Sequence, residues 1–330
     1  MKIEPVTSPP GDRLLEVSDL TVKFALRRAD LTAVNDVSFN LSKGERMGLV
    51  GESGAGKSVT GFALLRLIAK PGYIAGGKIV FDGTDLASVS EEVMRDVRGN
   101  RMSMIFQDPM MTLNPVLTIG TQMVETLKAH RDISTAEARE IAVDKLRKVY
   151  IPSPEKRLKQ YPHEFSGGMR QRIVIAIALL TDPALIIADE PTTALDVTIQ
   201  AEIMDLLLEL CESERMGLIL ITHDLAVVSQ VTQKVAVMYA GRIIETGLTD
   251  ELIRNPLHPY TRGLIGALPQ SGRTRERLAQ IPGVMPSLKN IPSGCAFHPR
   301  CGLKCSKVCE TEIPLLKSRA DGNLVACHCV

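Results

Sequence analysis

The sequence predicts an α/β fold whose buried strands end in polar, chemistry-bearing segments. Short apolar runs at residues 47–50, 185–188 and 218–222 are typical of strands covered on both faces. The first run is followed at residues 58–68 by apolar side chains that suit a packed helix. Because ligands bind at the carboxyl edge of parallel sheets, we expect the polar residues after these strands to form one site.

A glycine-rich segment, here called the phosphate loop (residues 51–58), joins the first strand to its helix. Its pattern is G-x-x-x-x-G-K-S, and strand, loop and helix together form the context of a phosphate cradle. Glycines let backbone N–H groups turn inward, and the helix N-terminus adds partial positive charge. We expect Lys57 to reach the β- and γ-phosphates and Ser58 to bind Mg²⁺, rather than a plain turn with a solvated lysine. The nucleotide-binding candidates here are Gly51, Ser53, Gly54, Gly56, Lys57, Ser58 and Val59.

Two adjacent carboxylates and a histidine follow the other two strands. Asp189 and Glu190 end the second apolar run, and His223 ends the third. Asp189 is placed to hold Mg²⁺, and Glu190 to orient or deprotonate an attacking water. His223 is a candidate γ-phosphate contact. Solvated acids and a structural histidine are the alternatives, and the nearby phosphate loop disfavours them.

The segment Ser166-Gly-Gly-Met-Arg170 completes a resemblance to the nucleotide-binding subunit of an ABC transporter, over about residues 14–246. Met169 stands where glutamine is more usual, and this replacement is typical of peptide-importer ATPases. Ser166, Gly167 and Gly168 open an apolar helix at residues 169–180, which makes a second anion-binding helix start.

The resemblance implies a P-loop NTPase (RecA-like) core, an antiparallel β subdomain, an inserted helical subdomain and a small cysteine-rich C-terminal extension. The expected division is a flexible N-terminus, a nucleotide-binding domain, a helical subdomain within it, and the extension: residues 1–13, 14–250, about 108–180 and 251–330. Helical patterns at residues 116–130 and 135–149 fit the inserted subdomain.

The resemblance also implies a head-to-tail dimer that encloses two ATP molecules. Ser166, Gly167 and Gly168 would then contact the nucleotide of the opposing subunit, and Asp196 would lie at the dimer contact. Gln107 resembles the glutamine that touches Mg²⁺ and water. Phe24 is the candidate aromatic beneath the adenine ring, although a strand-end phenylalanine also suits a core.

Composition limits the compartment and the partners. Lys and Arg number 39 against 38 Asp and Glu, for a formal charge of +1, and no long basic stretch indicates nucleic acid. The polar, proline-rich start has no signal core, and the longest apolar run is far below the roughly 18 residues of a membrane span. We expect a peripheral protein on the cytoplasmic face of the inner membrane. The resemblance implies a second ATPase subunit (a paralogue, or a second copy), two transmembrane permease subunits and, indirectly, an extracytoplasmic solute-binding protein.

Six of the seven cysteines lie in the last 36 residues, after a segment, Asn255-Pro-Leu-His-Pro-Tyr-Thr261, similar to peptide-permease ATPases. In a reducing cytosol, clustered thiols favour zinc or an iron–sulfur cluster over disulfides, and His298 and His328 are further candidate ligands. Spacing alone leaves these choices open, together with metal-free thiols. The resemblance favours a [4Fe–4S] cluster on Cys295, Cys301, Cys309 and Cys327, with Cys305 and Cys329 as alternates.

Taken together, the sequence predicts an ATP-hydrolysing subunit of an ABC importer for peptides or a related small solute. The alternative is an ABC ATPase that acts in nucleic-acid repair or translation, although the long coiled-coil insertions common in such relatives are absent from the sequence. A second alternative makes the cysteine-rich tail a metal or redox sensor that regulates transport.

Overall fold

The computed structural model describes residues 12–27, 29–193, 195–267, 280–319 and 322–330. The chain divides into two compact units, Met1–Ser88 with Leu220–Val330 (the first unit) and Val89–Ile219 (the second unit). Most of the predicted flexible N-terminus lies outside the described residues. Among the described residues, no helix combines the length and apolar character that crossing a bilayer requires.

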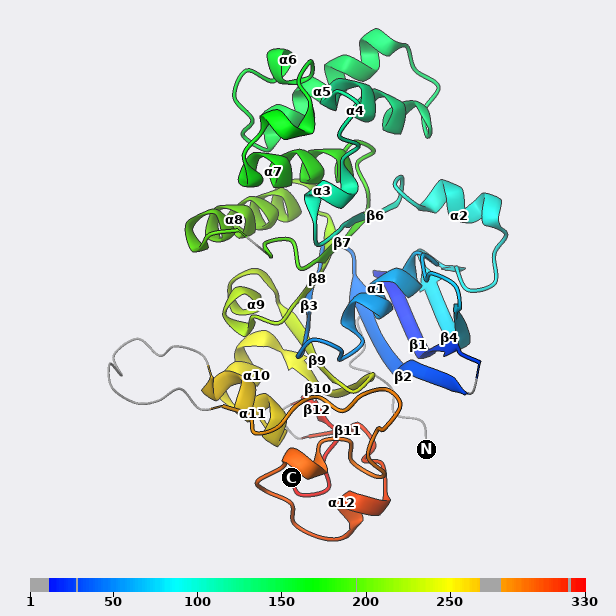
Figure 1. Ribbon diagram of the computed structural model, residues 1–330, viewed down its shortest axis with the longest axis vertical. Coiled ribbons are helices and arrows are strands. Elements are labelled where there is room, and N and C mark those ends of the chain that lie inside the picture. The colour runs from blue at the N-terminus through cyan, green and yellow to red at the C-terminus, as the bar shows by residue number, and fades with distance from the viewer. Residues whose placement is uncertain (1–11, 28, 194, 268–279, 320–321) are drawn as a thin grey trace. The chain divides into compact units, whose positions relative to one another are not determined.

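The first unit begins with an antiparallel sheet in the order β2-β1-β4-β5, which confirms the predicted β subdomain (Figure 1). Leu15 and Val17 on one side of a pairing irregularity in β1, and Leu20 and Val22 on the other, are buried at every second position, as expected for a sheet with one face on the core. The elements up to the division are β1 (Arg13–Ala25), β2 (Asp30–Ser42), β3 (Arg46–Val50), α1 (Lys57–Leu64), β4 (Gly72–Phe81) and β5 (Thr84–Asp85).

The strand that precedes the phosphate loop, β3, pairs in parallel with β9, from Met47 opposite Lys234 to Val50 opposite Val237. β9 continues antiparallel into β10. The division between the units falls within β8, which is buried along its whole length. These elements are β8 (Gly217–Thr222), α9 (Leu225–Val231), β9 (Lys234–Tyr239) and β10 (Arg242–Leu248).

Within the residues that the structure describes, the regular elements of the C-terminal extension are short (Figure 1). Its last strands return to the sheet, because β12 pairs with β10 and β11 pairs with β12. The elements are α10 (Thr249–Arg254), α11 (Pro259–Gly266), η2 (His298–Arg300), α12 (Val308–Thr311), β11 (Lys317–Ser318) and β12 (Leu324–Val325).

The second unit contains the parallel strands β6 and β7 and most of the helices. Its two central helices match the predicted helical patterns, and serine or threonine caps both: Thr118 accepts a hydrogen bond from the N–H of Thr121, and Ser134 from that of Glu137. The elements are α2 (Glu91–Val97), β6 (Met102–Ile105), α3 (Pro109–Thr112), α4 (Ile119–Lys128), α5 (Thr135–Lys148), α6 (Pro154–Arg157), η1 (Pro162–Glu164), α7 (Gly167–Ala178), β7 (Leu185–Asp189) and α8 (Val197–Glu214).

Two helices end earlier than their apolar patterns predict. α1 ends at Leu64 rather than at residue 68, because Arg66 adopts a left-handed φ of 51° that cannot continue a helix. α7 ends at Ala178 rather than at residue 180, where Leu179 caps it. In both places apolar side chains beyond the helix remain buried, so hydrophobicity alone does not mark a helix end.

Candidate functional site

The shape of the phosphate loop depends on glycine at three positions. A Cβ on Gly51 would lie 2.4 Å from the carbonyl oxygen of Met238, and one on Gly56 would lie 2.7 Å from that of Ala33. Gly54 and Gly56 have φ values of 84° and 101°, in the left-handed region that favours glycine. The loop therefore holds its turn against neighbouring strands, as the sequence pattern requires.

Lys57 begins α1 and turns back over the phosphate loop. Its side chain is buried, and Nζ donates to the carbonyl oxygens of Gly51 at 2.8 Å and Glu52 at 3.1 Å. Ser58 and Val59 follow in the first helical turn and are half-buried. An ammonium and a helix N-terminus at one loop can bind a phosphate group, because both favour negative charge.

The carboxylates predicted after β7 occupy different environments. Asp189 is the last residue of the strand and is buried, whereas the backbone of Glu190, just after the strand, has a left-handed φ of 44°. Oε2 of Glu190 accepts hydrogen bonds from Gln107 Nε2 at 3.1 Å and from the Thr193 hydroxyl at 2.9 Å. The structure thus brings together Gln107 and Glu190, which lie 83 residues apart. Thr193 is a contact that the sequence analysis missed, and its place three residues after Glu190 in a turn was the available signal.

The serine-glycine segment opens α7 as predicted. The Ser166 hydroxyl accepts a hydrogen bond from the Met169 N–H at 3.4 Å, which makes it the N-cap. A Cβ on Gly168 would lie 2.8 Å from Ile199, and one on Gly167 would lie 3.5 Å from Leu195. Gly168 therefore allows the start of α7 to approach the start of α8, whereas a Cβ at Gly167 would make an ordinary contact.

Asp196, predicted to lie at a dimer contact, is the N-cap of α8 within this chain. Its Oδ1 accepts a hydrogen bond from the Ile199 N–H at 3.0 Å. A capping carboxylate beside exposed backbone N–H groups stabilises the helix start.

Phe24 and His223 both lie at strand ends. Phe24 is half-buried near the end of β1 and lies opposite Leu31 of β2 and Gly72 of β4. His223 is exposed directly after β8, and the following residue, Asp224, caps α9. The structure places Phe24, His223 and the phosphate loop in the first unit, and Gln107, Asp189, Glu190, residues 166–168 and Asp196 in the second.

The start of the C-terminal extension is held by one buried carboxylate. Glu245 of β10 is fully buried and accepts hydrogen bonds from the backbone N–H groups of Leu257 at 2.7 Å and His258 at 2.9 Å. Burial raises the pKa of Glu245. Nδ1 of His258 in turn accepts the Tyr260 N–H at 3.0 Å and caps α11. Burial lowers the pKa of His258 to about 3, which keeps the imidazole neutral and able to accept this bond.

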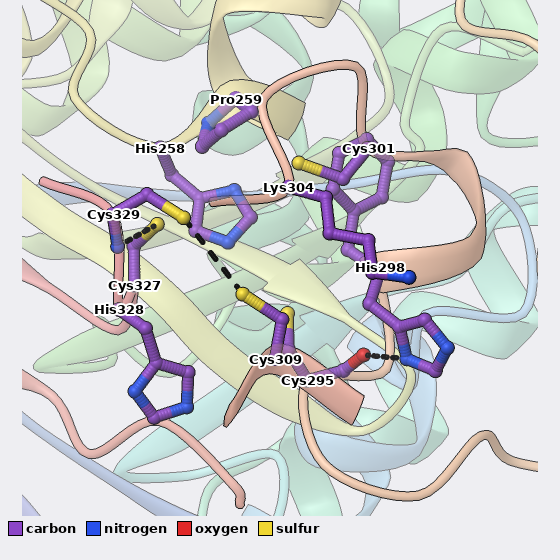
Figure 2. A pocket seen from close by; sticks show the side chains of 11 residues that line it. His258, Pro259, Cys295, His298, Cys301, Lys304, Cys309, Cys327, His328 and Cys329 are labelled. Carbon is purple, nitrogen blue, oxygen red and sulfur yellow. Dashed lines mark hydrogen bonds between the residues drawn. The ribbon is translucent and has the colours of Figure 1, made fainter. Parts of the chain in front are cut away.

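Four of the clustered cysteines are thiols that line one small pocket, with a cavity volume of about 10 Å³ (Figure 2). They are the four predicted ligands, Cys295, Cys301, Cys309 and Cys327. Burial raises the pKa of the Cys295 thiol, and three neighbouring thiols raise it further. Such a donor set suits a metal that binds thiolates, since a cation favours the deprotonated form. The cavity itself has room for about one water molecule, so a cluster would require the thiol side chains to move apart.

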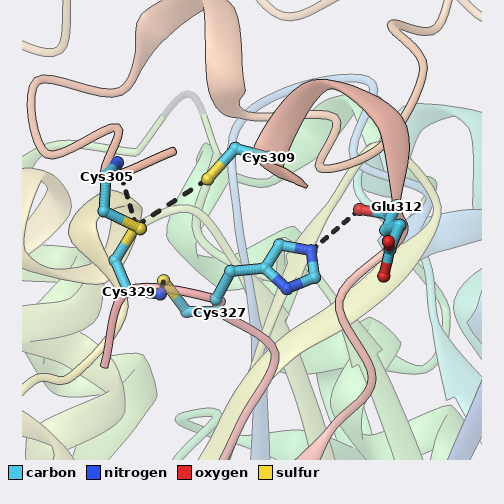
Figure 3. The surroundings of a disulfide bond; sticks show 6 residues. Cys305, Cys309, Glu312, Cys327 and Cys329 are labelled. Carbon is cyan, nitrogen blue, oxygen red and sulfur yellow. Dashed lines mark hydrogen bonds between the residues drawn. A yellow bond between two sulfur atoms is a disulfide. The ribbon is translucent and has the colours of Figure 1, made fainter. Parts of the chain in front are cut away.

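The alternate ligands Cys305 and Cys329 form a disulfide, which corrects two sequence expectations (Figure 3). Their Cα atoms lie 5.7 Å apart, a separation at which a disulfide forms, whereas the sequence analysis favoured a metal over disulfides and kept these two cysteines as alternate ligands. As disulfide sulfurs they cannot act as thiolate ligands. Cys309 lies beside the disulfide, with its sulfur 3.8 Å from that of Cys329. The sulfurs of Cys305, Cys309 and Cys329 all lie within 4.8 Å of one another.

The other two candidate ligands face backbone oxygens. His298 Nδ1 lies 3.0 Å from the carbonyl oxygen of Cys295 (Figure 2). His328 Nε2 lies 2.8 Å from the carbonyl oxygen of Glu312. Each histidine is thus oriented by a hydrogen bond on one ring nitrogen, and each also lines the cysteine pocket.

The α/β fold, the phosphate loop and the capped serine-glycine helix define an ATP-binding cassette. Residues 34–193 match the family model described as ABC transporter. Residues 244–309 match a second model, described as Oligopeptide/dipeptide transporter, C-terminal region.

Relatives and solved structures agree with this class. The chain is 47% identical to the dipeptide transport ATP-binding protein DppD of Escherichia coli K12, covering 96% of each chain. It is 50% identical to the oligopeptide transport ATP-binding protein OppD of Bacillus subtilis 168, over 92% of this chain and 86% of that one. A structure of cbiO1 from Clostridium perfringens matches with a TM-score of 0.63 at 26% identity, over 74% of this chain and 92% of that one. The dimeric cassette MJ0796 matches with a TM-score of 0.64 at 25% identity, over 72% and 99%. The chain therefore belongs to the ABC transporter ATPases.

Proposed function

We propose that this ATPase drives the uptake of peptides or a related small solute through transmembrane partner subunits. The main support for this proposal is the C-terminal extension, because residues 244–309 match the C-terminal region of oligopeptide and dipeptide transporters. Relatives that share about half of its residues over most of the chain are named dipeptide and oligopeptide transport ATP-binding proteins. The ATPase then lies on the cytoplasmic face of the inner membrane, attached through two permeases and served by a solute-binding protein. Its expected domains are residues 14–250 and 251–330, with the helical subdomain at about 108–180.

The residues of the phosphate loop grip the nucleotide of this chain. Lys57 exchanges its present carbonyl partners for the β- and γ-phosphates, and Ser58 and Asp189 hold Mg²⁺. The adenine stacks on Phe24, and His223 contacts the γ-phosphate. These roles are supported by the buried, loop-facing position of Lys57 and by the strand-end positions of the others.

Glu190 acts as the general base of hydrolysis. As a water oxygen bonds to the γ-phosphorus, the water proton passes to the Glu190 carboxylate and the bond to the ADP oxygen breaks. Gln107 and Thr193 orient the carboxylate through their hydrogen bonds, and Gln107 also contacts Mg²⁺ and water.

A second ATPase subunit completes each site. Residues 166–168 and Asp196 would meet the nucleotide held by that subunit, which is a paralogue or a second copy of this chain. The dimeric form of the cassette MJ0796 supports this arrangement. ATP binding closes the pair and hydrolysis reopens it, which moves the transmembrane partners.

Reconstitution tests the transport function. The chain is assembled with its permease partners in vesicles that contain trapped ATP, and uptake of a labelled dipeptide is measured with the matching binding protein. Uptake that depends on ATP and disappears with Lys57→Ala supports the proposal. A complex that hydrolyses ATP yet moves neither peptides nor peptide-like solutes would refute the cargo class while leaving the ATPase intact.

We further propose that Cys295, Cys301, Cys309 and Cys327 hold a [4Fe–4S] cluster that fixes the extension in place. The cluster would supply four thiolate–iron bonds between segments that otherwise contain little regular structure. Support comes from the shared pocket and from the pairing of Cys305 with Cys329, which leaves these four thiols.

Metal analysis of protein purified without oxygen tests the cluster. About four iron and four sulfide per chain are expected, with a loss in Cys301→Ser and retention in Cys305→Ala as the matched control. One zinc per chain, or no metal, would contradict the cluster. Unchanged uptake and normal assembly in Cys301→Ser would exclude a regulatory sensor.

A further inference from the structure

The second residue of the phosphate loop, Glu52, is contacted by the C-terminal extension at both its backbone and its side chain. Its N–H donates to the Tyr260 hydroxyl oxygen at 2.9 Å. Its carboxylate receives two parallel hydrogen bonds from Arg300, with Nη1 3.0 Å from Oε2 and Nη2 3.1 Å from Oε1. The ion pair joins residues 248 positions apart. The phosphate loop is therefore fastened to the extension by Tyr260 and Arg300, two residues that lie outside the nucleotide-binding motifs.

Arg300 is itself held firmly. Nε donates to the carbonyl oxygen of Pro282 at 2.7 Å, Nη2 to that of Gly283 at 3.4 Å, and Nη1 to the Tyr239 hydroxyl at 3.3 Å. Only 8% of its side chain is exposed. Because its orientation is fixed by these partners, Arg300 presents a rigid two-pronged donor, a geometry that matches a carboxylate.

Aromatic rings link this ion pair to the cysteine pocket. Tyr239, Tyr260 and Phe297 pack edge to face, with ring centroids 4.8 to 5.4 Å apart. The Arg300 guanidinium lies 5.8 Å from the Tyr239 ring and 5.9 Å from that of Phe297. Phe297 also lines the cysteine pocket. A packed aromatic cluster resists deformation, so the fold of the extension determines where Arg300 stands.

The charge of Glu52 makes this contact relevant to nucleotide binding. A carboxylate in the phosphate loop repels a triphosphate, and the repulsion is strong where burial limits screening. Arg300 cancels that charge and directs the Glu52 side chain toward the extension. We propose that Arg300 is a positioning residue for the nucleotide: it neutralises Glu52 and, with Tyr260, fixes the first turn of the phosphate loop, so that the extension forms part of the ATP site. This inference rests on the proposed role of the phosphate loop.

The proposal can be tested through charge, because a purely structural contact would not be restored by removing the charge of Glu52. Dissociation constants for a fluorescent ATP analogue are measured on the full chain, together with thermal unfolding. In Arg300→Met the unpaired Glu52 carboxylate weakens binding about fivefold to tenfold, and Arg300→Lys has a smaller effect because lysine neutralises without the two-pronged geometry. Glu52→Gln weakens binding less than Arg300→Met does, since it removes the repelling charge together with the ion pair. The double variant Glu52→Gln with Arg300→Met returns to within about twofold of the parent.

Controls separate the outcomes. Arg319→Met makes the same substitution at an exposed arginine of the extension and should leave binding unchanged. Lys57→Ala reports on the phosphate loop itself, and unchanged binding there would refute the proposed nucleotide site. If Lys57→Ala binds poorly while Arg300→Met binds as the parent does, the inference is overturned. It is also overturned if the double variant binds no better than Arg300→Met, because removing the charge of Glu52 would not repair a loss of packing.

Tyr260→Phe tests the backbone contact separately. The variant keeps the aromatic packing and removes only the oxygen that accepts the Glu52 N–H. A rise of about twofold to fivefold in the dissociation constant for the ATP analogue, with an unchanged kcat at saturating ATP, is expected. A fall in kcat at constant affinity would contradict a positioning role in binding.

Discussion

Different interactions stabilise the irregular backbone of the phosphate loop and that of the C-terminal extension. The loop takes its shape from glycines with positive φ, from the close packing of Gly51 and Gly56 against neighbouring strands, and from a helix that starts at Lys57. The extension has a four-residue helix, α12, and two-residue strands, β11 and β12. It is held by single side chains such as Glu245 and Arg300, which reach distant segments.

The two regions are therefore sensitive to different changes. The backbone of the loop lies so close to neighbouring strands that a single added methyl group can disturb it. The extension relies on buried polar groups that must all be paired, so loss of one partner leaves a costly unpaired group.

The largest effect is expected for Glu190→Gln. The amide keeps the shape of the side chain and cannot accept the water proton, so hydrolysis should fall at least about a hundredfold while ATP affinity is kept. Phosphate release and nucleotide binding are measured side by side. Glu209→Gln, at an exposed acid of α8 in the same unit, serves as the control. Near-normal turnover would remove Glu190 from the mechanism.

A methyl group in the phosphate loop should have the next largest effect. Gly51→Ala places a Cβ 2.4 Å from a backbone oxygen, so the loop or β9 must shift, at a cost of about 2 kcal/mol or more in unfolding free energy or in nucleotide binding. Chemical denaturation and nucleotide titration measure both. Gly76→Ala is the matched control, since nothing lies within 4 Å of its added Cβ. If the protein tolerated both substitutions equally, the close packing of Gly51 against β9 would not constrain the loop.

The extension should be weakened by Glu245→Ala. The change leaves the N–H groups of Leu257 and His258 without their acceptor and costs about 2 kcal/mol in unfolding free energy. Limited proteolysis locates the loosened segment, which we expect after β10. Asp250→Asn, at an exposed acid of α10, should cost less than about 0.5 kcal/mol. A protease pattern unchanged from the parent would mean that Glu245 does not anchor the extension.

The smallest effect concerns pH. The pKa of His258 is about 3 in the fold and 6.5 in its ordinary state, so the unfolded chain takes up a proton that the folded chain excludes. The stability is present well above pH 6.5 and is lost as the pH falls below it, by about 1.4 kcal/mol at pH 5.5. Melting temperatures from pH 7.5 to 5.5 measure the loss. His258→Asn keeps a capping acceptor without titrating, and an equally steep fall in that variant would assign the pH dependence to other groups.

Sequence patterns were sufficient to predict the positions of strands and helices whose apolar residues recur at short intervals. The strands before the phosphate loop and before Asp189, and the helices α4 and α5, stand where the apolar patterns predict them. The closeness of Gln107 and Glu190 also fits the predicted site, since both follow strands of one parallel pair. The predicted ends of α1 and α7 were wrong, because buried apolar residues continue past each helix.

Contacts of the extension could not be read from the sequence. Nothing in the spacing of six cysteines distinguishes Cys305 and Cys329 from the other four, and their pairing depends on how two distant segments meet. The same holds for Arg300, which lies one residue before a candidate ligand and yet contacts the phosphate loop.

The α/β class, the phosphate loop and the order of the polar groups at the strand ends could be predicted from the sequence, because the glycine pattern and the apolar runs lie among neighbouring residues. The pairing of the thiols, the carboxylate that anchors the extension and the contact between Glu52 and Arg300 became visible only in the folded chain. Such contacts depend on the three-dimensional path of the chain between segments up to 248 residues apart, and side chains of the same type can satisfy many alternative pairings.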